Sequence, residues 1–175
     1  MGIFKLFCTP QSGFSSSMMI EIATEWSKVF VKDAPTLFAI TYNYDEIYMF
    51  CCWILLDYGK NYGYLNKNSD INRFFETIFQ AVKNTGEYDQ SDMDQFMFRV
   101  SQYESEIGGM LKCDYPRTPM FFPEILFARF TEVDFTKKRY DSFQDMDDLI
   151  CFSDYFGSFW NKVNRDLMER FPKRK

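Results

Sequence analysis

The chain of 175 residues contains no histidine. Nucleophilic sites of the Ser-His-Asp and Cys-His kinds need an imidazole base, so both are excluded. Zinc sites with histidine ligands and di-iron bundles with Glu-x-x-His motifs are excluded for the same reason. Any catalysis would have to depend on carboxylate, Tyr, Lys, Cys or Arg side chains. The sequence identifies no catalytic residue, no cofactor site and no motif of a protein family.

Five cysteines are present, but no two are spaced as Cys-x-x-Cys. Cys51 and Cys52 are adjacent in the most apolar stretch of the chain, which is typical of free, buried thiols in a reducing compartment. The first residues show no cleavable signal pattern. We therefore expect a cytoplasmic protein.

No apolar run is long enough to cross a membrane. The longest uninterrupted one, residues 47–56, has roughly half of the length that a transmembrane helix needs.

The net charge argues against nucleic acids as general partners. The chain has 20 Lys and Arg and 25 Asp and Glu, which gives a net charge of −5. An acidic balance argues against general affinity for nucleic-acid phosphates.

Aromatic residues are abundant, at 20% of the chain with 21 Phe. Each buried ring removes a large apolar area from water, and aromatic surface left over would suit a partner protein or a second copy of the chain in a homo-oligomer. The length is that of one domain. We expect a single all-helical domain over residues 1–175, with an irregular lead-in at 1–16 and a frayed basic tail at 172–175.

The most apolar part of the chain is the stretch from residue 35 to residue 58, PTLFAITYNYDEIYMFCCWILLDY. Its apolar residues recur at the spacing of one helical face, which predicts a helix that begins near Pro35 and stops at Gly59. Further apolar residues lie off that face, as in helices at the centre of a bundle. The residues of the main face are Ile40, Tyr44, Ile47, Tyr48, Cys51, Ile54, Leu55 and Tyr58.

The alternative for this stretch is a β-hairpin over residues 37–56, which would give an α+β fold. Tyr, Phe, Ile and Thr are common in strands, so the composition allows it. The chain would then have to reverse at Asp45-Glu46, and neither residue adopts the positive φ of a two-residue hairpin turn at low cost. The spacing therefore favours the helix.

Five further segments carry apolar residues at helical spacing behind a capping residue. They predict an all-α, single-domain bundle of about six helices with the apolar helix at its centre. The expected starts are Ser15–Ser17, Asn68 or Ser69, Asp89 or Ser91, Pro123, and Ser142 with Asp145. Met97, Ile125 and Ile150 are among the residues expected on the buried faces.

Several acidic residues are weak candidates for a metal site. A carboxylate-metal enzyme of the all-α type, acting on a phosphate ester or nucleotide, would need acids from different helices to converge on Mg²⁺ or Mn²⁺. The candidates are Glu21, Glu25, Asp45, Glu46 and Asp148. No motif spacing enforces that convergence, and acids one turn apart are more often a solvated helix face. We assign no metal site from the sequence.

A non-catalytic protein-binding module is the function that the sequence favours, in the manner of a small immunity or inhibitor protein. Its acidic face would meet a basic partner by electrostatic complementarity. The candidate contact residues are acidic or lie in a proline-bounded apolar loop: Asp45, Glu46, Met120, Phe121, Phe122, Asp145, Asp147 and Asp148. Residues 120–122 are either such a surface or a lid over the core. A third hypothesis is a small-molecule sensor with an apolar pocket between helices.

Overall fold

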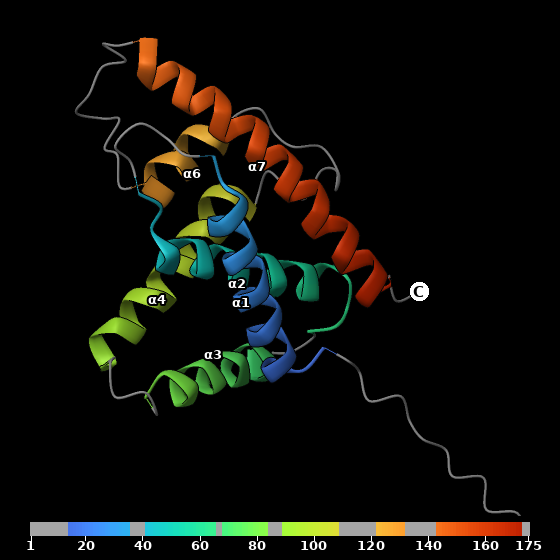
Figure 1. The fold of residues 1–175 in the computed structure, drawn as a ribbon. Coiled ribbons are helices and arrows are strands. Elements are labelled where there is room, and N and C mark those ends of the chain that lie inside the picture. The colour runs from blue at the N-terminus through green and yellow to red at the C-terminus, as the bar shows by residue number, and fades with distance from the viewer. Residues whose placement is uncertain are drawn as a thin grey trace, which may run out of the picture.

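The computed structural model describes residues 14–35, 41–65, 68–83, 89–108, 122–131 and 143–172. Within these ranges all regular structure is helical and no strand is found, so the prediction of an all-α bundle is confirmed. The helices are α1 (Ser16–Asp33), α2 (Tyr44–Asn61), α3 (Asn68–Lys83), α4 (Gln90–Tyr103), the π-helix η1 (Glu104–Gly108), α6 (Phe122–Thr131) and α7 (Phe143–Arg170). In Figure 1, α1 and α2 cross at the centre, with α3 below them, α4 to the left and α7 along the upper right. None of the described helices is both long and apolar enough to cross a bilayer.

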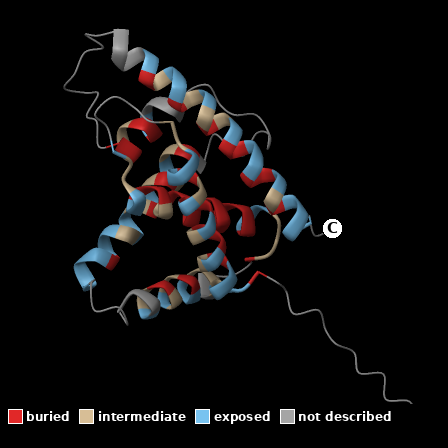
Figure 2. Ribbon diagram, in the orientation of Figure 1, coloured by how far each residue is buried: buried red, intermediate tan, exposed pale blue. Residues whose placement is uncertain are grey.

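The central helix, α2, is buried along most of its length (Figure 2). It begins at Tyr44, later than predicted, because the side chain of Asn43 caps it by accepting a hydrogen bond of 3.0 Å from the backbone N–H of Glu46. Pro35, the predicted start, lies outside the helices. Because residues 44–56 are helical, the hairpin alternative is wrong.

α2 also continues past Gly59, the predicted stop, to Asn61. Gly59 is buried, and a Cβ built on it would lie 2.7 Å from a ring carbon of Phe14 and 2.7 Å from a methyl carbon of Leu65. The Gly59 carbonyl accepts hydrogen bonds of 2.8 and 2.9 Å from the backbone N–H groups of Tyr64 and Leu65. This glycine allows the segments before α1 and after α2 to approach α2 closely, and it does not end the helix.

α1 packs across α2, and its predicted start is confirmed. The Ser15 side chain caps α1 by accepting a hydrogen bond from the backbone N–H of Met18 at 3.3 Å. The buried residues of α1 recur every three or four positions, as one helical face requires. They are Met19, Ile22, Ala23, Trp26, Ser27 and Phe30.

Three side-chain donors tie the long helix α7 and the residue after it to α1 and α2. The Tyr155 hydroxyl donates to the carbonyl oxygen of Phe30 at 2.8 Å. The indole N–H of Trp26 donates to Oδ2 of Asp166 at 2.9 Å. The Tyr58 hydroxyl of α2 donates to the carbonyl oxygen of Phe171 at 2.6 Å. These bonds satisfy polar groups that packing removes from water, so the end of the chain is fixed against the centre of the fold.

Aromatic rings from four helices meet in the core, mostly edge to face. The ring centroid of Phe130 on α6 lies 5.4 Å from those of Phe30 on α1 and Phe50 on α2. The ring of Phe152 on α7 lies 5.1 Å from that of Phe127 on α6. Such pairs contribute about 0.5–1.5 kcal/mol each beyond the area that they bury. The core is therefore aromatic, as the composition predicts.

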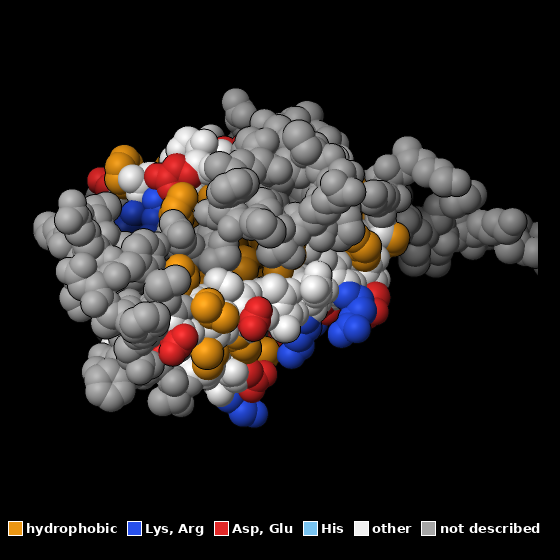
Figure 3. Space-filling model, turned by 90° about the horizontal axis from the view of Figure 1, so that it is seen from above, with side chains coloured by type: hydrophobic (Ala, Val, Ile, Leu, Met, Phe, Trp, Pro, Cys, Tyr) orange, Lys and Arg blue, Asp and Glu red, His pale blue; other side chains and the backbone are white. Residues whose placement is uncertain are grey.

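The expected apolar faces are wrong at four residues: Tyr44 is 36% exposed, Met97 42%, Ile125 37% and Ile150 55%. Ile125 and Ile150 each lie two residues before a buried ring of the same helix. Since each residue turns the helix by about 100°, their side chains point away from those rings. Met97 lies at the border of the face that α4 buries. Isolated exposed apolar residues are normal. Figure 3, which views the molecule from above, shows apolar side chains among acidic and basic ones.

Candidate functional site

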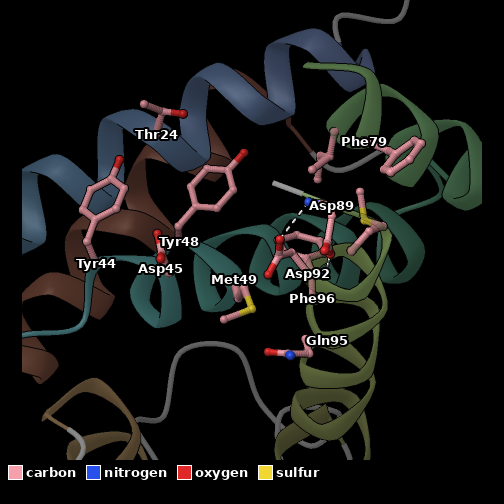
Figure 4. Close-up of a pocket in the computed structure, with 12 residues that line it drawn as sticks. Thr24, Tyr44, Asp45, Tyr48, Met49, Phe79, Asp89, Asp92, Gln95 and Phe96 are labelled. Atoms are coloured by element: carbon pink, nitrogen blue, oxygen red, sulfur yellow. Dashed lines mark hydrogen bonds between the residues drawn. The ribbon is translucent and has the colours of Figure 1, made fainter. Parts of the chain in front are cut away.

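A cleft opens between α1, α2, α3 and α4, with a cavity of about 350 Å³ (Figure 4). We call it the acidic cleft and define it by its lining residues. They are Thr24 of α1, Tyr44, Asp45, Tyr48 and Met49 of α2, Ile78 and Phe79 of α3, and Asp89, Asp92, Met93, Gln95 and Phe96 at the start of α4. The cleft combines an apolar wall with a charged rim.

The wall of the acidic cleft is built from aromatic and thioether side chains. The rings of Tyr48 and Phe96 lie 6.3 Å apart between centroids, which joins α2 to α4 across the cleft. Phe96 also packs edge to face on Phe75 of α3, at 6.1 Å. Met49 and Met93 complete the wall, and unbranched thioether side chains adapt readily to the shape of a partner.

The rim carries three exposed aspartates, Asp45, Asp89 and Asp92, and no Lys or Arg is among the lining residues that the structure describes. Asp89 caps α4: its Oδ1 accepts hydrogen bonds from the backbone N–H groups of Ser91 at 2.7 Å and Asp92 at 3.2 Å. Oδ2 of Asp92 accepts one from the backbone N–H of Asp89 at 2.8 Å. This capping box fixes both carboxylates, and the helix N-terminus favours their negative charge.

The polar groups of the wall are neutral hydroxyls. In Figure 4 the Tyr48 ring rises from α2 toward α1 and Thr24. Burial raises the pKa of Tyr48, and the neighbouring Cys52 thiol raises it further. Burial also raises the pKa of Tyr44. Both phenols are therefore protonated near neutral pH, where they serve as hydrogen-bonding groups and not as bases.

Glu46 follows Asp45 in the sequence but points into the protein, where it is 5% exposed. The Tyr103 hydroxyl donates a hydrogen bond of 2.5 Å to Oε1 of Glu46, and Nε of Arg99 lies 3.0 Å from the same oxygen. The guanidinium of Arg129 lies over the Tyr103 ring at 4.8 Å. The prediction that Glu46 belongs to an acidic contact surface is wrong, because this carboxylate is used within the fold.

The polar cluster around Glu46 continues into the π-helix η1, which follows α4 directly. The indole N–H of Trp53 donates to Oε2 of Glu104 at 3.1 Å, and Nη2 of Arg129 lies 2.5 Å from Oε2 of Glu106. A π-turn is wider than an α-turn and changes the direction of the side chains that follow it. Here it directs acidic residues toward α2 and α6.

The remaining acidic candidates do not form one site. Glu21 and Glu25 are exposed on α1, and Oε2 of Glu25 lies 3.1 Å from Nη2 of Arg170. Asp147 is exposed on α7, whereas Asp148 is buried. Within the described residues, no three Cys, Asp or Glu side chains lie close enough to hold a metal ion. The five metal candidates therefore do not converge there.

Other predicted contact residues fall on parts that the structure does not describe. Met120 and Phe121 lie outside the described residues, as do the side chains of Phe122 and Asp145. The buried carboxylate of Asp148 lies near Tyr42. Burial, and then the charge of Asp148, raise the pKa of Tyr42 to about 12. Of the predicted contact residues whose side chains the structure describes, Asp45 is the one that lines the acidic cleft.

Comparison of the chain with protein-family models, curated proteins and solved structures finds no match. Function is therefore inferred from the geometry of the acidic cleft. Apart from Asp45, the residues of the cleft were not predicted as a site, although two signals in the sequence point to them. Asp89 is recognisable as a cap of α4, and Tyr48 and Phe96 belong to helical stripes.

Proposed function

We propose that the chain is a non-catalytic protein-binding module of the immunity or inhibitor type, and that the acidic cleft holds a basic, apolar segment of its partner. The observation that supports this is the composition of the cleft. Four helices line the cleft, its wall is apolar, three exposed aspartates form the rim, and no basic residue is found among the described lining residues. Complementary charge raises association rates and selects among partners, and buried apolar area supplies affinity.

The two parts of the cleft favour a protein segment over a small molecule. A cavity of about 350 Å³ is at the lower end of the range for ligand pockets and has room for one or two bulky side chains. The carboxylates of the rim are exposed to solvent, so they would meet groups that lie outside the cavity. A partner protein supplies both an apolar anchor and flanking Lys or Arg from neighbouring residues.

We also propose the cytoplasm as the location of the module. Cys51 and Cys52 are free thiols in the buried part of α2. Burial raises the pKa of Cys51 to about 12 and that of Cys52 well above its ordinary value. Such thiols stay protonated and unreactive near neutral pH. Buried free cysteines are typical of proteins that work in a reducing compartment.

Affinity capture from the native cytoplasm tests the binding function, with three forms of the full chain: the natural chain, Asp45→Lys and Asp147→Lys. Both aspartates are exposed and lie near the start of a helix, but Asp45 lines the acidic cleft and Asp147 does not. We expect a partner protein that the natural chain and Asp147→Lys retain and that Asp45→Lys loses. A partner retained equally by all three forms, or no partner of the natural chain, would contradict the proposal. Equal thermal unfolding of the three forms serves as the folding control.

A further inference from the structure

We infer that the partner segment held by the acidic cleft is an amphipathic α-helix that carries Lys or Arg on both sides of its apolar face. This inference rests on the proposed function and specifies its partner. Three features support it: the hydrogen-bonding capacity of the cleft wall, the side chains that make up that wall, and the placement of the charges on the rim.

Beyond the Tyr44 and Tyr48 hydroxyls and the Gln95 amide, the wall of the cleft offers few partners for an extended backbone. It is made of side chains from four helices, and backbone groups inside a helix are already bonded to one another. The Thr24 hydroxyl is also used, since it donates to the carbonyl oxygen of Ile20 at 2.8 Å. Within the described ranges there is no strand edge that an extended segment could join. An extended segment would therefore bury N–H and C=O groups without partners, which is costly.

A helical segment avoids this cost because it satisfies its own backbone and presents only side chains to the cleft. Its apolar side chains at positions i, i+3, i+4 and i+7 would meet Tyr48, Met49, Met93 and Phe96. Two of these residues are methionines, whose flexible side chains adjust to the ridges of a docked helix. Grooves that bind amphipathic helices commonly depend on such a wall.

The rim places negative charge on two separate helices. Asp45 lies in the first turn of α2, and the capping pair Asp89 and Asp92 lies at the start of α4. Figure 4 shows Asp45 on one side of Met49 and the capping pair on the other. A helix lying over Met49 would therefore have carboxylates along both flanks of its apolar face. Lys or Arg on both flanks would complement them, and acidic residues there would be repelled.

The test uses two displayed peptide libraries of ~18 residues, or five helical turns, with identical composition. Both draw their apolar positions from Leu, Ile, Met, Phe and Trp and their polar positions from Lys, Arg and Gln. One library places the apolar positions at i, i+3, i+4 and i+7, and the other alternates them as a strand would. Both are selected against the full natural chain, with soluble Asp45→Lys chain as competitor to remove peptides that bind elsewhere.

We expect enrichment from the helical library alone. Synthetic copies of the enriched peptides should gain helical circular dichroism on binding and lose affinity by about tenfold toward Asp45→Lys. Affinity toward Asp147→Lys should be unchanged. Enriched peptides resynthesised with Glu at the Lys and Arg positions should not bind.

The other outcomes separate the two proposals. Enrichment of the strand-spaced library, with binding that Asp45→Lys abolishes, would overturn the helix inference and leave the cleft as a protein-binding site. If binders appear only when the Asp45→Lys competitor is left out, and these bind all three forms equally, both proposals are overturned. Failure of both libraries to yield any binder would overturn the helix inference, whereas the capture experiment decides the proposed function independently.

Discussion

The hydroxyl of Tyr103 donates a hydrogen bond of 2.5 Å to the buried carboxylate of Glu46, and this pair joins α4 to α2 beside the acidic cleft. The two residues are 57 positions apart in the chain. Asp45, on the rim, precedes Glu46 in the first turn of α2. The position of the rim relative to α4 therefore depends on a bond made inside the protein.

Removal of the Tyr103 hydroxyl should destabilise the fold. In Tyr103→Phe the Glu46 carboxylate loses a donor in a site that water does not reach, while Arg99 stays 3.0 Å from Oε1. We expect the free energy of unfolding in urea to fall by about 1–3 kcal/mol, the cost of an unsatisfied buried group.

The matched control is Tyr64→Phe, which removes a hydroxyl that donates to the carbonyl oxygen of Pro172 in an exposed setting. Its effect should be smaller, because water replaces the lost partner. A loss below about 0.5 kcal/mol in Tyr103→Phe, as for an ordinary surface substitution, would mean that the buried bond does not stabilise the fold.

The helices were predictable from the sequence because their signals are local. Ser15 and Asp89 cap the helices that they were expected to cap, and apolar spacing identified α2 as central. The start of α2 was predictable as well. Asn43 followed three residues later by Glu46 is the pattern of a helix N-terminus, and it is a stronger signal than Pro35.

The candidate site was not predictable in the same way, because it depends on how four helices are placed in space. Asp45 and Glu46 are neighbours in the first turn of one helix, yet one side chain meets solvent and the other meets Tyr103. The partner that decides this lies on another helix, just before a π-turn that no local pattern announced. Burial of a charged residue follows from its tertiary contacts, not from its own sequence context.

Stability should fall in alkaline solution through the buried tyrosines. Burial, and then the charges of Tyr62 and Tyr64, raise the pKa of Tyr58 from 10.0 to about 12. The native state therefore holds the Tyr58 proton at pH values where the unfolded chain has lost it. Since the unfolded state binds fewer protons in that window, this contribution is fully present below pH 10.0 and is lost as the pH rises through about 12.

Urea unfolding at a series of pH values between about 8 and 12 measures this loss. In Tyr58→Phe the free energy of unfolding should start lower, because the bond to the carbonyl oxygen of Phe171 is gone, and should then decline less steeply with pH. Tyrosinate absorbance of the native protein should show phenols that ionise only near unfolding. Equal slopes for the two proteins would contradict the contribution of Tyr58.

Binding at the acidic cleft should weaken with salt. The carboxylates of Asp45, Asp89 and Asp92 are exposed, so their attraction to a basic partner is screened over a Debye length. We expect the dissociation constant of the captured partner to rise between about 0.05 M and about 0.5 M salt, mainly through a slower association rate. The variant Asp45→Asn should bind more weakly at low salt and respond less to salt than Asp147→Asn. Identical salt dependence of the two variants would exclude Asp45 from the interface.

Two helical glycines should respond in opposite directions to replacement by alanine. Alanine favours a helix over glycine by about 1 kcal/mol. A Cβ at Gly157 in α7 meets no atom within 4 Å, so Gly157→Ala should raise the free energy of unfolding by about 0.5–1 kcal/mol.

At Gly59 a Cβ would lie 2.7 Å from Phe14 and Leu65. The Phe14 ring is held between Tyr64, at 5.1 Å, and Phe171, at 4.7 Å, and has little freedom to move aside. Overpacking of this kind costs about 1–3 kcal/mol, so Gly59→Ala should lower the free energy of unfolding despite the gain in helix propensity. Calorimetric melting of the two variants beside the natural chain measures both signs. Stabilisation by Gly59→Ala would mean that Phe14 does not pack against α2 as described.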